Sequence, residues 1–200
     1  MKYITDLKQL DLNGTYSYAD YLTWQFDEAI ELIKGKISFM SPAPNVKHQR
    51  LSRKLSFQID NFLQGKSCEL FVAPFDVRLY DRRKSLLANQ DIHTVVQPDL
   101  CVICDADKLD AHGCNGAPDW IIEILSPSNN KKEVKTKHQL YCESGVREYW
   151  LVYPYEQVIY DFVLNAERYE LMNTFVTDDI ASPHCFPELR IDLQTLFAEQ

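Results

Sequence analysis

The chain has 200 residues, 46% hydrophobic and 25% charged, which excludes an intrinsically disordered protein and suits one domain over residues 1–200. No apolar run is long enough to span a membrane, so we expect no membrane partner. The net charge of −8 argues against a broad surface that coats DNA without regard to sequence, but it allows a local basic groove.

The first half of the chain predicts two helices and several short strands. A short helix is expected over Ser17–Phe26, followed by Ala29–Met40, where a turn at Lys34-Gly35 leads into a strand. Ser41–Pro44 then breaks the pattern. The clearest helix spans Asn45–Leu63, because its apolar residues recur at spacings of four, four and three. That apolar stripe consists of Leu51, Leu55, Ile59 and Phe62, with His48 at its N-terminal end.

The rest of the chain alternates strands with one long helix. The most continuously apolar segments, Val95–Cys104 and Trp120–Leu125, predict central strands, and the polar segment Asp105–Pro118 between them predicts a loop. Asn130-x-x-Glu133 resembles a capping box that opens a helix through Ser144. Further strands are expected at Cys68–Ala73, Phe75–Tyr80, Glu148–Val152, Val158–Leu164 and Tyr169–Met172, with a short helix from Asp192. Interleaved helices and strands predict a mixed α/β domain.

The N-terminus predicts the compartment of the protein, and the compartment in turn predicts the state of the cysteines. Met1–Lys8 lacks the apolar segment of a signal peptide, so we expect a cytoplasmic location. In such a compartment the six cysteines are expected to be free thiols. Cys101-x-x-Cys104, with His112 and Cys114 nearby, raises the alternative of a zinc site. Residues three apart on a strand point to opposite faces, so buried structural cysteines are the favoured interpretation.

Two carboxylates stand on segments that otherwise predict buried strands. Asp99 follows Gln97-Pro98, and Glu123 interrupts the apolar run Trp120–Leu125. A buried carboxylate is costly unless a cation or hydrogen bonds compensate it. If the two strands are neighbours, both side chains project from one face to a common point. Such a pair suffices for Mg²⁺, which keeps water and substrate oxygens as its other ligands.

Lys137 is the candidate cation for this acid pair. A compact acid-x-lysine motif would place its lysine at Leu125, so this strand does not supply one. Val134, Lys137 and Tyr141 share one side of the predicted helix. A lysine on an inward stripe either extends to the surface or points at a buried anion, and spacing alone leaves both open.

Ordered motifs along most of the chain carry a resemblance to a known family. They include Glu31-Leu32-Ile33-x-Gly35, His48-Gln49, Ala73–Leu79, Gln97-Pro98-Asp99, Gly116–Asp119, Glu123–Ser128, Lys137-x-x-x-Tyr141 and Gly145-Val146-x-Glu148-Tyr149-Trp150. With these motifs the chain resembles the Uma-two family of restriction-endonuclease-like proteins, within the PD-(D/E)xK nuclease superfamily, from Tyr16 to Phe197. It departs from the family pattern at Lys34, where an aspartate is common.

The resemblance implies a restriction-endonuclease-like mixed β-sheet flanked by helices, with the N-terminal helix and C-terminal strands as extensions of the core. It also implies a Mg²⁺ or Mn²⁺ site from Asp99 and Glu123, a helix-borne acid at Glu31, and a catalytic lysine that has moved to the following helix at Lys137. The implied function is a metal-dependent DNA endonuclease, and we expect a homodimer because double-strand cutting needs two active sites. The alternatives are a non-catalytic nucleic-acid-binding or assembly protein, or a hydrolase of RNA.

Overall fold

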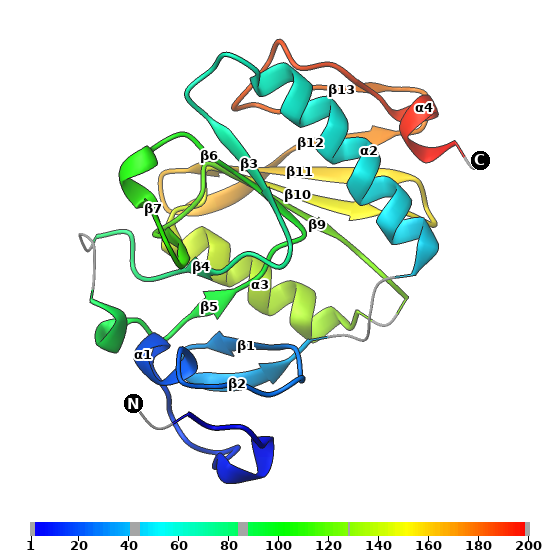
Figure 1. Ribbon diagram of the computed structural model, residues 1–200. Helices are drawn as coiled ribbons and strands as arrows, with labels where there is room; N and C mark the ends of the chain where they lie inside the picture. Colours follow the sequence, from blue (N-terminus) through cyan, green and yellow to red (C-terminus); the bar gives the residue numbers. More distant parts are fainter. Residues whose placement is uncertain (1–2, 41–44, 84–87, 128, 199–200) are drawn as a thin grey trace.

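A computed structural model describes residues 3–40, 45–83, 88–127 and 129–198 of the chain. It has a mixed α/β fold with two six-stranded mixed sheets and flanking helices, which confirms the expected fold class (Figure 1). The break expected at Ser41–Pro44 lies outside the described residues.

The larger sheet has the strand order β12-β11-β10-β9-β6-β3. Its strands are β3 (Glu69–Val72), β6 (Leu100–Ile103), β9 (Trp120–Ile124), β10 (Glu148–Tyr153), β11 (Val158–Asn165) and β12 (Arg168–Val176). β9 pairs in parallel with β10 and antiparallel with β6. Every residue of β9 is buried, as expected for a central strand covered on both faces.

The second sheet has the order β2-β1-β5-β4-β8-β7. Its strands are β1 (Ile30–Ile33), β2 (Lys36–Phe39), β4 (Val77–Arg78), β5 (Val95–Val96), β7 (Leu109–Asp110) and β8 (Gly113–Asn115). The single strand predicted over Val95–Cys104 is therefore wrong, because β5 and β6 belong to different sheets. The chain crosses between the sheets at Gln97–Asp99, where Pro98 has no N–H to offer a strand ladder.

Two long helices cover opposite faces of the larger sheet (Figure 1). α2 (Val46–Leu63) begins at Asn45, whose side chain accepts a hydrogen bond from the His48 N–H at 3.0 Å. α3 (Lys131–Ser144) begins at Asn130 and ends at Gly145, which adopts a left-handed conformation with φ of 89°. Both helices confirm the predicted apolar periodicity, and in α3 the side chain of Asn130 accepts the Glu133 N–H at 2.9 Å, as the predicted cap requires.

The shorter elements depart most from the sequence prediction. α1 (Tyr18–Tyr21) covers only part of the helix expected over Ser17–Phe26. The segment expected as a loop, Asp105–Pro118, contains β7, β8 and a 3₁₀ helix. The remaining elements are η1 (Leu7–Gln9), η2 (Asn89–Asp91), η3 (Ala106–Lys108), β13 (Ile180–Ala181), β14 (Ile191–Asp192) and α4 (Leu193–Phe197). Within the described ranges, no helix has the length and apolarity to cross a membrane.

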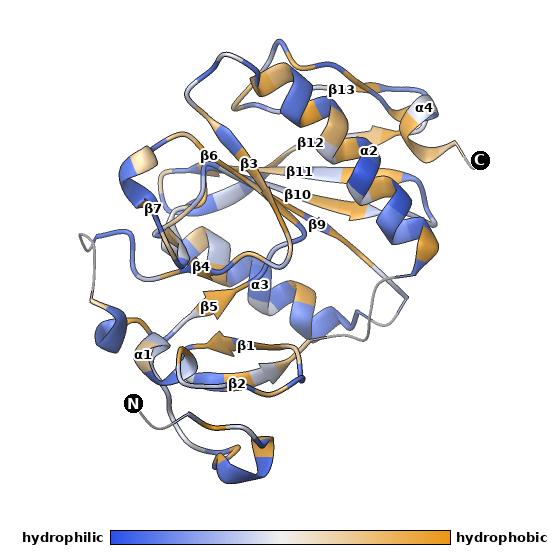
Figure 2. Cartoon of the chain, viewed as in Figure 1, coloured by the Kyte–Doolittle hydropathy of each residue, from blue (hydrophilic) through white to orange (hydrophobic). Residues whose placement is uncertain are grey.

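Each face of the larger sheet carries its own hydrophobic cluster. Leu100, Trp120 and Trp150 point toward α2, whereas Ile121, Tyr149 and Leu151 point toward α3. Figure 2 shows hydrophobic residues along these strands and many hydrophilic residues on the two covering helices. This alternation decides which side of the sheet each buried polar residue reaches.

The cysteine prediction is wrong for one pair. Cys68 and Cys104 form a disulfide, because β3 and β6 pair with Glu69 opposite Ile103 and so bring the two cysteines together. This neighbour relation depends on sheet order, which the spacing of the cysteines does not reveal. Cys101 and Cys114 are buried free thiols in the cluster beneath α3, as the structural interpretation predicted.

Candidate active site

Asp99 and Glu123 lie opposite each other on neighbouring chain segments. β6 pairs with β9 so that Leu100 faces Ile122, which places the preceding Asp99 beside Glu123. One Asp99 oxygen, Oδ2, accepts the backbone N–H of Ile124 at 2.7 Å. The other, Oδ1, lies 3.1 Å from Nε2 of His48. The strand pairing thus brings both predicted acids to one point.

Glu31 reaches the same point from the second sheet. The expectation of a helix-borne acid is wrong, because Glu31 belongs to β1, which forms a hairpin with β2. Lys34, with φ of 51°, and Gly35 close that hairpin, so the residues before them extend as a strand. Glu31 is 4% exposed, and its Oε1 accepts the backbone N–H of Gln97 at 3.0 Å.

Lys137 bridges the two glutamates. Its Nζ lies 3.0 Å from Oε1 of Glu123 and 3.1 Å from Oε1 of Glu31, and the residue is 8% exposed. Of the two orientations that the sequence left open, the structure therefore has the lysine aimed at buried anions. The Tyr141 hydroxyl, one helical turn further along α3, donates to the same Glu123 oxygen at 2.5 Å.

Burial and charge shift the ionisation of this cluster. Burial, aided by the charges of Asp99 and Glu31 and opposed by that of Lys137, raises the pKa of Glu123 to about 7. For Lys137, burial lowers the pKa, but the charges of Glu123 and Glu31 outweigh it and leave the pKa above its usual value. The lysine is therefore a permanent cation, while Glu123 titrates near neutral pH.

These side chains line a cavity of about 470 Å³. Its wall comes from β1, the start of α2, the end of β3, the crossover before β6, the end of β9 and the start of α3: Ala29, Glu31, Met40, His48, Gln49, Ser52, Val72, Ala73, Pro74, Gln97, Asp99, Glu123, Ile124, Leu125, Ser126, Asn129, Glu133 and Lys137. All four predicted site residues are thus brought together. The roles of Ser126 and Asn129 in the wall were missed, although both follow the strand that carries Glu123.

Asp76 directly precedes β4 and lies outside this wall. It accepts hydrogen bonds from Gln97 Nε2 at 2.8 Å and from the Tyr18 hydroxyl at 3.1 Å, and it does not line the cavity. Asp76 is therefore not one of the acids that line this cavity. Its hydrogen bond to Gln97 supports the crossover that leads to Asp99.

The donor set suits a hard cation held by few protein ligands. In both Glu31 and Glu123 the hydrogen bonds go to Oε1, and Oε2 accepts none from the residues that the structure describes. One oxygen of each glutamate is thus left for another partner. Those same residues contain no group of three or more His, Cys, Asp or Glu that could hold a metal. The arrangement fits Mg²⁺ bound by two carboxylates, with water and substrate oxygens as the other ligands.

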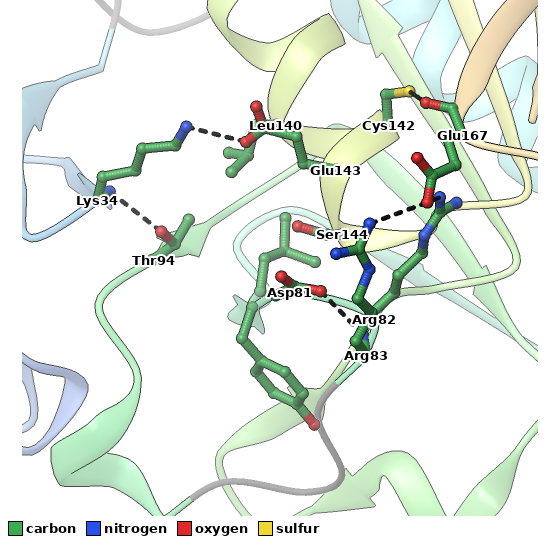
Figure 3. Close-up of a pocket in the computed structure, with 12 residues that line it drawn as sticks. Lys34, Asp81, Arg82, Arg83, Thr94, Leu140, Cys142, Glu143, Ser144 and Glu167 are labelled. Carbon is green, nitrogen blue, oxygen red and sulfur yellow. Dashed lines mark hydrogen bonds and ion pairs between the residues drawn. The ribbon is translucent and has the colours of Figure 1, made fainter.

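A second cavity, of about 390 Å³, lies near the C-terminal end of α3 (Figure 3). It contains the basic residues Arg82 and Arg83, which both contact Glu167. Lys34 also lines it and pairs with Glu143 at 2.9 Å, so the lysine that departs from the family pattern belongs to this cavity and not to the wall of the first. The charges of this cavity compensate one another, unlike the acid-rich wall of the first cavity.

Two comparisons with known proteins show the family and the fold of the chain. The profile of the Uma2 family, described as “Putative restriction endonuclease”, matches residues 18–194. The chain belongs to the Uma2 family. A crystal structure from Anabaena variabilis, described as a “putative nuclease belonging to DUF820”, is similar to this Uma2 chain with a TM-score of 0.70 and 22% sequence identity. The match covers 91% of this chain and 97% of the Anabaena chain. At that identity the likeness shows a shared fold. No curated protein matches the chain.

Proposed function

We propose that this Uma2 protein is a metal-dependent endonuclease that hydrolyses phosphodiester bonds of DNA. The observation that supports it most strongly is the convergence of Glu31, Asp99, Glu123 and Lys137 on one cavity. Three acids and one lysine, all supplied by different elements, are costly to bury together. Such a cluster is expected where charged substrates and cations are handled. The family description and the fold of the Anabaena protein point to the same activity.

Asp99 and Glu123, which both line the cavity, would hold the cation through carboxylate lone pairs that their hydrogen bonds leave unused. Bound there, Mg²⁺ or Mn²⁺ would supply a Lewis acid and lower the pKa of a coordinated water. Glu31 plays a supporting role, because its Oε1 helps to hold Lys137. In the reaction, a water oxygen bonds to phosphorus, the bond from phosphorus to one sugar oxygen breaks, and that oxygen takes up a proton.

Lys137 would orient the attacking water and stabilise the negative charge that develops on the phosphate. Its two carboxylate partners keep it charged and fix its ammonium group at the cavity wall. A preorganised cation in a water-poor site is worth more than one in solvent, because little reorganisation is needed during reaction. The cleavage step therefore depends on Lys137 as much as on either acid.

DNA cleavage by the purified protein tests the proposal directly. With Mg²⁺ or Mn²⁺ the wild-type protein should nick or cut plasmid DNA, and Asp99→Ala should abolish cutting while its circular dichroism and unfolding midpoint stay close to those of the wild type. Asp178→Ala is the matched control, since Asp178 is an exposed acid beyond β12. Equal cleavage by Asp99→Ala and the control would contradict the assignment. An RNA duplex and a single-stranded RNA in the same assay identify the preferred nucleic acid.

A non-catalytic nucleic-acid-binding protein is the second candidate, and one observation favours it. Lys137 already neutralises part of the charge of Glu31 and Glu123, so the cluster has an internal cation even without a metal. Mn²⁺ titration separates the two functions. A catalytic site should bind Mn²⁺ and lose that binding in Glu123→Ala, whereas a non-catalytic protein should show no loss that depends on this carboxylate.

The expected partners follow from the same proposal. Double-strand cleavage needs two active sites, so we propose that a homodimer acts on duplex DNA. Sedimentation equilibrium, with and without a DNA duplex, tests the stoichiometry. A monomer that nicks only one strand would retain the proposed chemistry and contradict the dimer.

A further inference from the structure

His48 is a buried histidine whose ring contacts an acid of the candidate active site. It lies in the first turn of α2, on the buried face of that helix with Leu51 and Leu55. Those two leucines pack into the hydrophobic cluster of the larger sheet. The His48 side chain is 8% exposed and instead approaches Asp99, with 3.1 Å between Nε2 and Oδ1.

The polar contacts of this ring are few for such a buried group. Within the described residues, Nδ1 is buried and has no hydrogen-bond partner. A buried polar atom without a partner costs about 1–3 kcal/mol, so an apolar side chain would serve packing better at this position. The hydrogen bond to Asp99 is what distinguishes histidine here from another leucine of the stripe.

Asp99 differs from the two glutamates in how the protein holds it. Both of its oxygens are engaged, Oδ1 by His48 and Oδ2 by the Ile124 N–H. In Glu31 and Glu123 the donors meet at Oε1. Two donors on two oxygens fix the rotation of a carboxyl group, and each oxygen keeps a second lone pair that can bind a cation. Asp99 is thus the most tightly oriented acid of the cavity.

The backbone of α2 fixes His48 in turn. Asn45 caps the helix and accepts the His48 N–H at 3.0 Å, and the leucines that follow anchor the helix on the sheet. The ring therefore approaches Asp99 from an element separate from β6 and β9. Orientation of a ligand by a neighbouring donor is a common way to raise metal affinity.

We propose that His48 is a positioning residue for the cation site. Its Nε2–H donates to Oδ1 of Asp99 and holds the carboxyl group in the orientation that binds the cation. The proposal rests on the proposed function, since it assigns His48 to the same site. It extends that function by making α2 part of the metal centre, although α2 contributes no metal ligand itself.

Three variants of the full-length protein test this role through Mn²⁺ binding. His48→Ala removes the donor and should weaken Mn²⁺ binding by about 10–100-fold. His48→Gln places an amide N–H near the position of Nε2 and should recover most of the affinity. His112→Ala, which removes an exposed histidine between β7 and β8, should bind Mn²⁺ like the wild type. Affinities are measured by electron paramagnetic resonance of free Mn²⁺.

A second measurement needs neither metal nor DNA. The Ile124 amide, which donates to the other Asp99 oxygen, should exchange with solvent faster in metal-free His48→Ala than in the wild type. His48→Gln should restore slow exchange, and amides of β10 should be unaffected in both variants. A helix that only loses packing would give equal effects in the alanine and glutamine variants.

The outcomes separate the two proposals. Unchanged Mn²⁺ affinity in His48→Ala, or equal loss in both His48 variants, overturns the positioning role. If the wild-type protein neither binds Mn²⁺ nor cuts DNA, the proposed function fails. In that case unchanged Ile124 exchange in His48→Ala overturns the contact as well, whereas faster exchange restored by glutamine upholds the orientation of Asp99 by His48.

Discussion

Two buried acid clusters occupy opposite faces of the larger sheet and differ in what surrounds them. Burial raises the pKa of both Glu123 and Glu148 to about 7. Glu123 faces α3, contacts the ammonium group of Lys137 and opens onto a cavity. Glu148 is fully buried on the face of Trp150, and its carboxyl group accepts the Trp150 indole N–H at 2.7 Å.

Hydrogen bonds, and not a cation, compensate the burial of the Glu148 carboxyl group. Its two oxygens also accept the backbone N–H groups of His184 and Cys185 at 2.9 and 2.6 Å. The neighbouring charge of Asp161 raises the pKa of Glu148 further. A raised pKa alone therefore does not identify an active site. The distinguishing features of Glu123 are a buried cation, a carboxylate oxygen that accepts no hydrogen bond from the described residues, and space for a ligand.

The largest effect is expected when the cluster of Glu31, Glu123 and Lys137 loses its cation. Lys137→Met leaves Glu31 and Glu123 buried without their cation, which should destabilise the metal-free protein by about 3–5 kcal/mol. Mn²⁺ should restore much of that stability, because it replaces the lost positive charge, while DNA cleavage should fall by at least about 10²–10³-fold. Urea unfolding with and without Mn²⁺ and a plasmid assay measure the two effects.

The matched control for this variant is Lys135→Met, which removes an exposed lysine from the same helix. It should retain wild-type stability and cleavage. A Lys137→Met protein as stable as the wild type without metal would contradict the idea that the lysine compensates the two glutamates. Retained cleavage would contradict its role in the reaction.

The second-largest effect concerns Glu148 and the way the free energy of unfolding depends on pH. The folded-state pKa of Glu148, about 7, exceeds its ordinary value of 4.5, so the folded protein binds more protons between these values. The free energy of unfolding should therefore fall as pH rises from about 4.5 to about 7 and level off above, with a contribution of Glu148 on the order of 3 kcal/mol. Glu148→Gln should lose this contribution. Urea unfolding across this pH range measures the slopes.

Glu123 also makes the free energy of unfolding fall with rising pH, but it does so equally in the wild type and in Glu148→Gln. The difference between their two curves therefore isolates the contribution of Glu148. Glu156→Gln serves as the control, because Glu156 is exposed in the turn between β10 and β11. It should keep the wild-type slope. Parallel curves for the wild type and Glu148→Gln would show that Glu148 ionises at its ordinary pKa.

The smallest effect concerns a single hydrogen bond at the cavity. Tyr141→Phe removes the hydroxyl that donates to Glu123, which should cost about 1–2 kcal/mol of stability. That hydrogen bond favours the ionised carboxylate, so its loss should raise the pKa of Glu123 above about 7. Carbon-13 NMR titration of labelled glutamate carboxyls measures the shift. Tyr155→Phe, at an exposed tyrosine, is the control and should leave the pKa of Glu123 unchanged. An unchanged pKa in Tyr141→Phe as well would contradict the effect of this hydrogen bond on Glu123.

Local sequence patterns predicted the elements that depend on neighbouring residues. α2 follows from apolar spacing, and α3 from the Asn130-x-x-Glu133 pattern at its start. The central strands β9 and β10 follow from short apolar runs. The same patterns failed where pairing between distant segments decides the structure. Such cases are the division of Val95–Cys104 between two sheets and the strands β7 and β8 within an expected loop.

The sequence by itself determined which residues can do chemistry here: two acids on strands that should be buried, and a lysine on the inward side of a helix. Only the tertiary structure decided that β1 brings Glu31 to Lys137 and that α2 brings His48 to Asp99. The first kind of information resides in spacings of a few residues, which fix the side of an element. The second depends on sheet order and helix packing, which join segments far apart along the chain.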